Sequence, residues 1–274
     1  MSESSYIDTS KPNIARMYDY WLGGKDNYEA DRKAADAVQE FRPAIAEQAL
    51  DNKRFLTRAV GYVAAQGVRQ FLDVGAGLPT SPTASGTAGW VATHRAAEQV
   101  VAEPVVAYVD YDPVAVAHSR ALLIGGAPHV VAVNGDMHDP AAILADDDIR
   151  AAGLDLTAPA CVILACVLHF VDAGTARDIV SGFTAALARG SYLLLSVGFA
   201  RADAADFATT YNSQNGARIY AHSWDQITGF FDGLDLVPPG VVDSADWQPG
   251  APQGGEGPAK DNFIAAAVAR VPSR

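Results

Sequence analysis

The chain has 274 residues, of which 49% are hydrophobic and 19% charged, a composition typical of a folded domain rather than of a disordered chain. Its formal net charge of −12 lies entirely beyond residue 69, because residues 1–69 hold ten Lys/Arg and ten Asp/Glu while the remainder holds ten against 22. An acidic main body repels phosphate backbones and anionic lipid, so we expect no nucleic-acid partner and no membrane-surface role.

The sequence shows no feature of a secreted or membrane protein. No apolar run approaches the roughly 20 residues that a membrane-spanning helix needs. The first residues, MSESSYIDTSKP, lack the basic end and apolar segment of a secretory signal. Cys161 and Cys166 fall in one predicted strand, about 16 Å apart on opposite faces, which is too far for a disulfide. We therefore expect a cytoplasmic protein with reduced cysteines.

The first 68 residues are predicted to form three helices. Apolar side chains recur at helical spacing from residue 14, and Gly23-Gly24 is expected to end the first helix. A second helix runs to about residue 40, with Asn27 as its candidate cap, and a third covers about 43–65. We divide the chain into a helical extension, residues 1–68, and a main domain, residues 69–274.

Beyond residue 69, short β-branched runs alternate with helical patterns. Strands that are almost wholly apolar and alternate with helices predict an α/β fold with a parallel, doubly wound sheet. The expected strands cover residues 70–74, 105–110, 129–133, 160–167 and 191–197. The expected helices cover about 88–102, 113–123, 139–151, 174–188, 203–213 and 223–231.

The end of the chain departs from this alternation. LDLVPPGVV (234–242) and FIAAAVARV (263–271) have no helix between them. A parallel crossover needs such a connection, so we expect these two strands to form an antiparallel pair at the end of the sheet.

A glycine-rich turn, DVGAG, follows the first predicted strand and contains Asp73, Gly75, Ala76 and Gly77. Glycines let the backbone approach a ligand closely, and an open α/β sheet binds ligands at the carboxyl ends of its strands. The dinucleotide fingerprint needs a further glycine near residue 80, where this chain has Leu-Pro-Thr. The turn indicates a ligand site and disfavours NAD, with a purely structural turn as the alternative.

Acidic residues follow the second and third predicted strands. In YVDYDP, which contains Asp110, Tyr111 and Asp112, the first carboxylate can accept hydrogen bonds from both ribose hydroxyls, and the second can cap the next helix or add a contact. In NGDM, Asp136 can accept from an exocyclic amine, and Met137 suits an adenine ring. Each motif alone fits an ordinary turn. Three acid-bearing loops after three successive strands together describe an adenosine pocket.

The fourth predicted strand ends in small residues, Ala165 and Cys166, which leave room for a ligand. His169 follows and could orient a substrate or act as a base, although a packed, hydrogen-bonded histidine is the commoner case. Other chemistries lack their motifs. No Cys/His cluster has zinc spacing, so no metal is expected, the acidic run 146–148 lacks the pattern of a calcium loop, and Gly-x-Ser-x-Gly is absent.

These motifs resemble those of a known group of enzymes. DVGAG, YVDYDP, NGDM and LACVLHF, in this order, are similar to motifs of S-adenosylmethionine-dependent methyltransferases with a seven-stranded Rossmann-like sheet. PNIARMYDYWLGGKDNYEADR, FLDVGAGLPT, LTAPACVILACVLHFV, GSYLLLSV and FFDGLDLVPPGVV extend the match over nearly the whole chain. Together they resemble the S-adenosyl methyltransferase family common in actinobacteria.

The resemblance implies a methyltransferase that uses S-adenosyl-L-methionine and acts on an unidentified, small-molecule acceptor. The alternatives are a catalytically silent, cofactor-binding regulatory protein, because no base is evident, and, less favoured, a nicotinamide-dependent oxidoreductase. The sequence assigns neither the acceptor nor the oligomeric state. The residues expected to bind the cofactor are Asp73, Gly75, Ala76, Gly77, Asp110, Tyr111, Asp112, Asp136, Met137, Ala165 and Cys166.

The stretch IARMYDYWLGGKDNYEADR (14–32) is the most specific part of the resemblance, and we interpret it as a lid. A cofactor at the edge of the sheet needs a cover that excludes water, and a cationic sulfonium suits aromatic faces. The Gly-Gly pair would let the chain turn over the site. The alternative is a helical pair that only covers the sheet. The candidate lid and substrate residues are Arg16, Tyr18, Tyr20, Trp21, Lys25, Asn27 and Tyr28.

One segment departs from the pattern of such enzymes. TSPTASGTAGWVAT (80–93) stands between the glycine turn and the next helix and contains no charged side chain. It looks like an insertion beside the cofactor, and it leaves the position of Thr80 and the start of that helix open.

Overall fold

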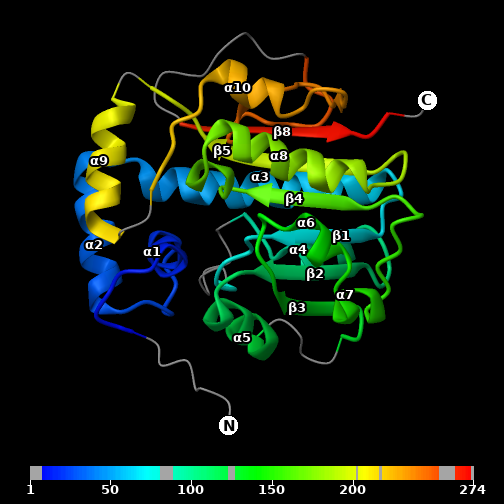
Figure 1. Cartoon of the computed structure of the whole chain (residues 1–274), viewed down its shortest axis with the longest axis horizontal. Helices are drawn as coiled ribbons and strands as arrows, with labels where there is room; N and C mark the ends of the chain where they lie inside the picture. Colours follow the sequence, from blue (N-terminus) through cyan, green and yellow to red (C-terminus); the bar gives the residue numbers. More distant parts are fainter. Residues whose placement is uncertain are drawn as a thin grey trace.

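An eight-stranded sheet forms the centre of the structure (Figure 1). The computed structural model describes residues 8–80, 89–122, 127–201, 203–215, 218–252 and 263–272. The strands lie in the order β3-β2-β1-β4-β5-β8-β6, and β7 also pairs with β8. Their bounds are β1 (Gln70–Val74), β2 (Val105–Asp110), β3 (Val130–Asn134), β4 (Cys161–Ala165), β5 (Tyr192–Gly198), β6 (Asp235–Leu236), β7 (Val242–Asp243) and β8 (Ile264–Arg270).

The sheet is parallel from β1 to β5 and antiparallel at its end. β8 runs antiparallel to β5, and the short strands β6 and β7 both run antiparallel to β8. The predicted doubly wound sheet and its antiparallel end are therefore confirmed. The strand order reverses between β1 and β4, because β2 and β3 lie on one side of β1 and β4 lies on the other. Open α/β sheets bind their ligands at such a reversal.

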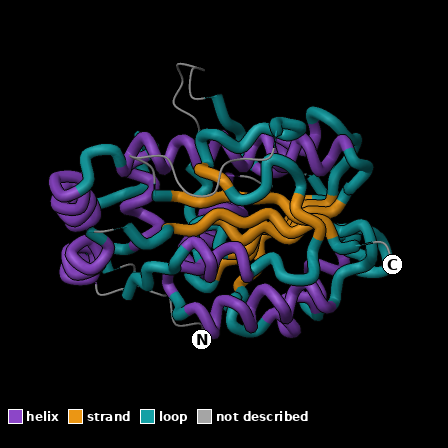
Figure 2. Tube along the Cα trace, turned by 90° about the horizontal axis from the view of Figure 1, so that it is seen from above, coloured by secondary structure: helices purple, strands orange, loops and turns teal. Residues whose placement is uncertain are grey.

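Helices cover both faces of the sheet, as Figure 2 shows with helices above and below the strands. In Figure 1, α1, α2 and α9 lie beyond the carboxyl end of β4. The bounds are α1 (Ile14–Trp21), α2 (Glu29–Phe41), α3 (Ile45–Ala65), α4 (Thr93–Glu98), α5 (Pro113–Leu122), α6 (Pro140–Leu144), α7 (Asp147–Ala151), the 3₁₀ turn η1 (Leu168–Phe170), α8 (Ala173–Ala185), α9 (Ala204–Asn215) and α10 (Trp224–Gly229).

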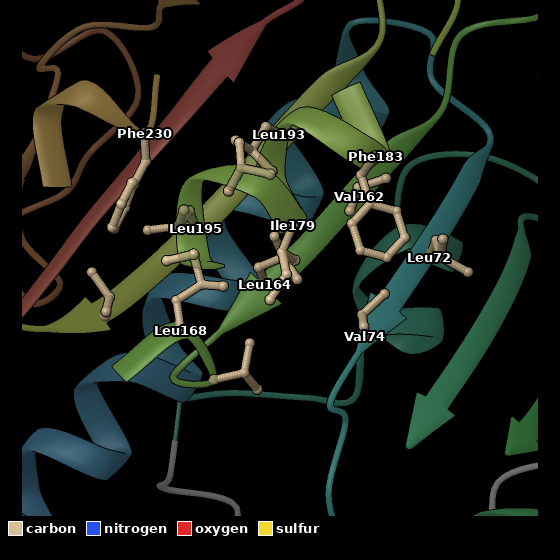
Figure 3. Close-up of a cluster of buried hydrophobic side chains, with 14 of the residues drawn as sticks. Leu72, Val74, Val162, Leu164, Leu168, Ile179, Phe183, Leu193, Leu195 and Phe230 are labelled. Carbon is tan, nitrogen blue, oxygen red and sulfur yellow. The ribbon is translucent and has the colours of Figure 1, made fainter. Parts of the chain in front are cut away.

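Side chains alternate between two cores because successive residues of a strand point to opposite faces. Leu72 and Leu164 face the α8 side, where they join Phe183 in the cluster drawn in Figure 3. Phe71 and Ile163, their neighbours in β1 and β4, face the α3 side instead. Burial on both faces explains why these strands are apolar throughout rather than at every second residue.

Several predicted elements have different bounds in the structure. The helix expected over 139–151 is split into α6 and α7, because Asp139 and Asp146 each cap a separate helix. The helix expected from about residue 88 begins only at Thr93. In place of the strand expected over 234–242, the structure has two separate strands of two residues each, β6 and β7. Residues 81–88 of the predicted insertion lie outside the described residues.

The N-terminal helices fall into two groups by what they pack against. α3 packs on the sheet, with Phe55 and Val60 in the same cluster as Phe71. α1 and α2 form a separate cluster with α9, in which Met17 and Phe207 are buried together. Figure 1 shows α2 and α9 side by side. The first two helices therefore form a cover at the carboxyl ends of the strands rather than part of the layer on the sheet face.

Two further expectations concern the cysteines and the membrane. Cys161 and Cys166 are both free thiols, as expected, but Cys166 lies beyond the end of β4, with a left-handed φ of 55°. Among the described helices, none combines the length and the apolar character that crossing a bilayer would require.

Candidate functional site

A cavity of about 510 Å³ opens at the carboxyl ends of the parallel strands. It lies at the reversal between β1 and β4, and residues after β1, β2, β3, β4 and β5 line it. This volume is within the range of small-molecule sites. α1 lies over the same end of the sheet, and Asn13, Ile14, Ala15, Tyr18 and Trp21 contribute to the cavity wall.

Every residue that the sequence assigned to the cofactor lines this one cavity. The sequence predicted eleven residues from four separate strand ends, and the fold brings all of them together. They are Asp73, Gly75, Ala76, Gly77, Asp110, Tyr111, Asp112, Asp136, Met137, Ala165 and Cys166.

The glycine turn after β1 has two positions whose backbone conformation only glycine adopts readily. Gly75 and Gly77 have φ values of 71° and 68°, in the left-handed region. A Cβ at Gly75 would lie 2.3 Å from Cγ1 of Val167, so this position also lacks space for a side chain. The turn directs the Gly77 N–H toward β2, where it donates to Oδ2 of Asp110 at 2.8 Å.

Asp110 is held rigidly at the end of β2. Its Oδ1 accepts the backbone N–H of Asp112 at 2.9 Å, opposite the bond from Gly77. Burial raises the pKa of Asp110, and the two backbone N–H groups oppose that rise. A carboxylate oxygen can accept more than one hydrogen bond, so both oxygens keep acceptor capacity for a ligand. A fixed, largely desolvated carboxylate of this kind suits a pair of ribose hydroxyls.

The two other carboxylates of the loops after β2 and β3, Asp112 and Asp136, have different partners. Asp112 caps α5 by accepting the Val114 N–H at 2.8 Å, and its second oxygen accepts from Asn13 Nδ2 at 3.2 Å. Asp136 is exposed and accepts from both the backbone N–H and the ring Nδ1 of His138. The His138 backbone N–H is the main cause of its lowered pKa. Asp112 is therefore the cap of α5, one of the two roles left open for it, and its contact with a ligand stays a prediction.

A lysine that sequence reasoning missed reaches the cavity from α3. The ammonium of Lys53 lies over the rings of Tyr18 and Trp90, at 5.7 and 5.8 Å from their centroids. Burial lowers the pKa of Lys53, while the Asp73 carboxylate acts in the opposite direction. Burial also raises the pKa of Asp73, which accepts the Thr93 hydroxyl at 2.6 Å. A signal for Lys53 existed, since it lies four residues after Ala49 and three before Leu56, next to the buried face of α3.

A buried hydrogen-bond chain positions Tyr18 at the cavity wall. The Ser196 hydroxyl donates to Asn52 Oδ1 at 2.6 Å, Asn52 Nδ2 donates to the Tyr18 oxygen at 3.0 Å, and Tyr18 donates to the Ala49 carbonyl at 3.1 Å. Burial raises the pKa of Tyr18, so the phenol is neutral. Burial likewise raises the pKa of the adjoining Cys166 thiol to about 11, so that it is not a thiolate nucleophile at neutral pH.

His169 lines the cavity but has the wrong properties for a general base. Burial, with His222 nearby, lowers its pKa to about 3. Its Nδ1 accepts the backbone N–H of Gly198 at 3.3 Å, which assigns the proton of the neutral ring to Nε2. His169 can therefore orient a ligand as a hydrogen-bond donor, which favours the first of the two roles predicted for it.

The predicted lid residues divide between the cavity wall and positions away from it. Tyr18 and Trp21 line the cavity. The lining residues do not include Arg16, Tyr20, Lys25, Asn27 or Tyr28.

Arg16, a candidate lid and substrate residue, is bound to a carboxylate inside the extension instead. Arg16 Nε binds Asp31 Oδ2 at 2.8 Å in a buried ion pair, and its guanidinium stacks on the Tyr28 ring. Asp31 also accepts the Tyr28 N–H, so Tyr28 rather than Asn27 caps α2. These contacts give α1 and α2 a fixed relative position.

Asp19 connects α1 to the segment after the glycine turn. It is 1% exposed and accepts from the Asp26 N–H and Asn27 Nδ2 through Oδ2 and from the Thr80 hydroxyl through Oδ1, the last at 2.6 Å. A Cβ at Gly24 would lie 2.0 Å from Oδ1 of Asp19. We call Asp19, Gly24, Asn27 and Thr80 the Asp19 latch. No local pattern in the sequence indicates this latch, since Asp19 and Thr80 are 61 residues apart.

The described residues contain no group of three or more His, Cys, Asp or Glu side chains that could hold a metal ion. The groups that line the cavity are carboxylates, backbone groups, aromatic rings and the cations of lysine and arginine.

Known proteins are similar to this chain over nearly its whole length. The sequence profile of the family described as S-adenosyl methyltransferase matches residues 1–272. A DUF574 family protein from Streptomyces avermitilis MA-4680 is 36% identical, with a TM-score of 0.85 and coverage of 97% of this chain and 100% of that chain. A protein from Thermobifida fusca YX assigned as a methyltransferase is 34% identical, with a TM-score of 0.84 and coverage of 97% of both chains. No curated protein matches the chain.

Proposed function

Because the chain belongs to the S-adenosyl methyltransferase family, we propose that this enzyme binds S-adenosyl-L-methionine in the cavity and methylates a small-molecule acceptor there. The observation that carries the proposal is the convergence of three acid-bearing strand ends and a glycine turn on one cavity, with Asp110 fixed by the Gly77 N–H. This arrangement fits an adenosine with its ribose on Asp110 and its adenine beside Tyr111, Asp136 and Met137.

The residues that remain suit the methionine end of the cofactor. The glycine turn allows close approach of the backbone. The Lys53 ammonium and the Asp73 carboxylate offer opposite charges to the carboxylate and ammonium groups of an amino acid. The aromatic face of Tyr18 suits a cationic sulfonium. When bound, the cofactor supplies an activated methyl group, and the protein supplies position and a dry site.

The acceptor atom must be nucleophilic without help from a base of the protein. His169 is a neutral hydrogen-bond donor, and the Tyr18 phenol and Cys166 thiol are also protonated. An acceptor that is already nucleophilic needs no protein base, because methyl transfer from a sulfonium is an in-line displacement. This absence of a base does not favour the regulatory alternative over catalysis.

We assign α1 and its turn the role of the lid. α1 contacts the cofactor region at two points, Asn13 to Asp112 and Asp19 to Thr80, and it presents Tyr18 and Trp21 to the cavity. Closure of such a cover excludes water, which strengthens electrostatic interactions inside. We also propose a reduced, cytoplasmic setting, in keeping with two free cysteines.

Two measurements test the proposal in sequence. Titration calorimetry with S-adenosylmethionine, S-adenosylhomocysteine and NAD should give binding for the first two and none for NAD. Transfer of a labelled methyl group from S-adenosylmethionine to the small-molecule fraction of a cell extract should then be detectable. Failure of both sulfur ligands to bind would refute the cofactor assignment. Binding without transfer to any fraction would refute the catalytic assignment.

A further inference from the structure

The side of the cavity away from the acidic loops is basic. Arg42 follows α2, Arg201 follows β5, and Arg218 lies between α9 and α10, and all three line the cavity. The acidic residues that line it among the described ones are Asp73, Asp110, Asp112 and Asp136, all from β1, β2 or the loops after β2 and β3. We call the wall that carries the three arginines the arginine wall.

The strand order gives the separation of the two charged regions. β2 and β5 are separated by β1 and β4 in the sheet, so that their ends lie three strand spacings apart. At about 4.8 Å per spacing this is about 14 Å, and β8, which brings Phe263, lies one spacing further. α9, which adjoins the arginine wall, lies beyond the carboxyl end of β4, away from α5 (Figure 1). A cofactor bound at the acidic loops therefore leaves this end of the cavity for another molecule.

The arginine wall is built from flat surfaces. The Arg42 guanidinium lies over both the Phe207 and the Phe263 ring, 4.5 and 4.6 Å from their centroids, and the Arg218 guanidinium lies over the Tyr220 ring at 4.9 Å. The two phenylalanine rings also contact each other, with centroids 5.6 Å apart. Planar guanidinium groups and aromatic rings therefore line this end of the cavity and offer flat faces on which a planar ligand can stack.

The positive charge of this wall is only partly neutralised. Arg42 forms an ion pair with Asp203 at 2.7 Å, yet its buried Nε donates to no acceptor among the described residues. Arg218 forms no ion pair within the described parts of the chain. S-adenosylmethionine carries a net positive charge, so it does not explain the guanidinium groups of Arg42 and Arg218. These groups are better explained by an anionic molecule that lies beside it.

We propose that the methyl acceptor is a small planar aromatic acid, whose carboxylate binds the arginine wall and whose nucleophilic atom lies at its opposite end. The proposal rests on the proposed function and names the class of its second substrate. In the reaction, a lone pair of the acceptor oxygen or nitrogen forms a bond to the methyl carbon while the carbon–sulfur bond breaks. The sulfur keeps that bonding pair in S-adenosylhomocysteine, and any proton on the acceptor atom passes to water. A bound carboxylate fixes orientation without requiring a base.

The test compares acids with their neutral amides in the presence of saturating S-adenosylhomocysteine. The probes are 4-hydroxybenzoate, 4-aminobenzoate and indole-3-carboxylate, each paired with its carboxamide and measured by titration calorimetry. A charge-assisted hydrogen bond to arginine predicts that at least one acid binds about 10–100-fold more tightly than its amide. The difference should shrink at high salt.

A variant locates the effect on the arginine wall. Arg218→Gln should reduce the preference for acid over amide to less than about threefold, since a neutral amide replaces the charged donor. Arg177→Gln, an exposed arginine of α8 outside the cavity, is the matched control and should keep the full preference. Both variants should still bind S-adenosylhomocysteine.

The outcomes separate this inference from the function it rests on. The acceptor class is wrong if S-adenosylhomocysteine binds but no acid binds more tightly than its amide. It is also wrong if Arg218→Gln keeps the preference for the acid. In both cases the cofactor assignment stands. If S-adenosylhomocysteine does not bind, the proposed function itself fails, whether or not the acids bind.

Discussion

The Asp19 latch gives the sharpest prediction, for the substitution Gly24→Ala. The added methyl carbon would lie 2.0 Å from Oδ1 and 2.3 Å from Cγ of the Asp19 side chain, well inside contact distance. Gly24 has an ordinary backbone conformation, since it is not among the residues with positive φ. The predicted effect is therefore a clash and not a loss of backbone freedom.

The magnitude follows from what the Asp19 carboxylate holds. It accepts hydrogen bonds from three groups, the Asp26 N–H, the Asn27 amide and the Thr80 hydroxyl, while it is almost fully buried. A hydrogen bond to a charged group contributes about 1.5–3 kcal/mol, so displacement that breaks one or two of them should cost about 1.5–6 kcal/mol. We expect this loss in the free energy of unfolding, with weaker binding of S-adenosylhomocysteine because Thr80 is released.

The assay is urea unfolding followed by circular dichroism, with Gly61→Ala as the control. Gly61 lies inside α3, and no atom lies within 4 Å of a Cβ built there. Alanine should therefore stabilise the protein by up to about 1 kcal/mol through its higher helix propensity. The reasoning is refuted if Gly24→Ala unfolds within about 0.5 kcal/mol of the parent protein, the range of ordinary surface substitutions.

Three other predictions concern the cofactor region. Asp110→Ala should weaken binding of S-adenosylmethionine by about 1–3 kcal/mol in calorimetry. Asp136→Asn should weaken it less, because an amide oxygen still accepts a hydrogen bond from the adenine amine. A folded Asp110→Ala variant with unchanged affinity would remove that carboxylate from the site. His169 has a folded pKa of about 3 against 6.5 in the unfolded chain, so the stability it contributes is present above pH 6.5 and is lost as the pH falls toward 3. His169→Gln should reduce that acid-induced loss in urea titrations at successive pH values, and identical profiles would contradict the assignment. Hydrogen exchange over residues 14–32 should slow on addition of S-adenosylhomocysteine, more than over residues 45–63, whereas unchanged exchange would make the extension a permanent cover.

The sequence was sufficient to predict the fold and to predict which residues of the acidic loops lie together at one cavity. Both depend on local patterns: apolar runs define the strands, and the carboxyl ends of parallel strands must meet at one edge. Asp73, Asp110 and Asp136 could therefore be assigned to one site without knowledge of any long-range contact. The antiparallel end of the sheet could be predicted for the same reason, because no helix separates its last two predicted strands.

The cover over the site could not be predicted in the same way, because its partners are distant in sequence. Ser196 and Asn52 are 144 residues apart, and their bond is what positions Tyr18. Charge alone also misled the assignment of Arg16. A sequence shows that a guanidinium is present but not that a carboxylate 15 residues on has already bound it.

The two residues of the Gly23-Gly24 pair are glycine for two different physical reasons. Gly23, with a φ of 76°, ends α1 through its backbone, as the sequence predicted. Gly24 is required because Asp19 occupies the space where its side chain would lie, which is a steric requirement set by a neighbour. That neighbour also holds Thr80 beside the glycine turn, while Trp21 of the same helix reaches the cavity. The pair therefore does more to fix α1 in place than to free it, and any movement of the lid must break the Asp19 latch first.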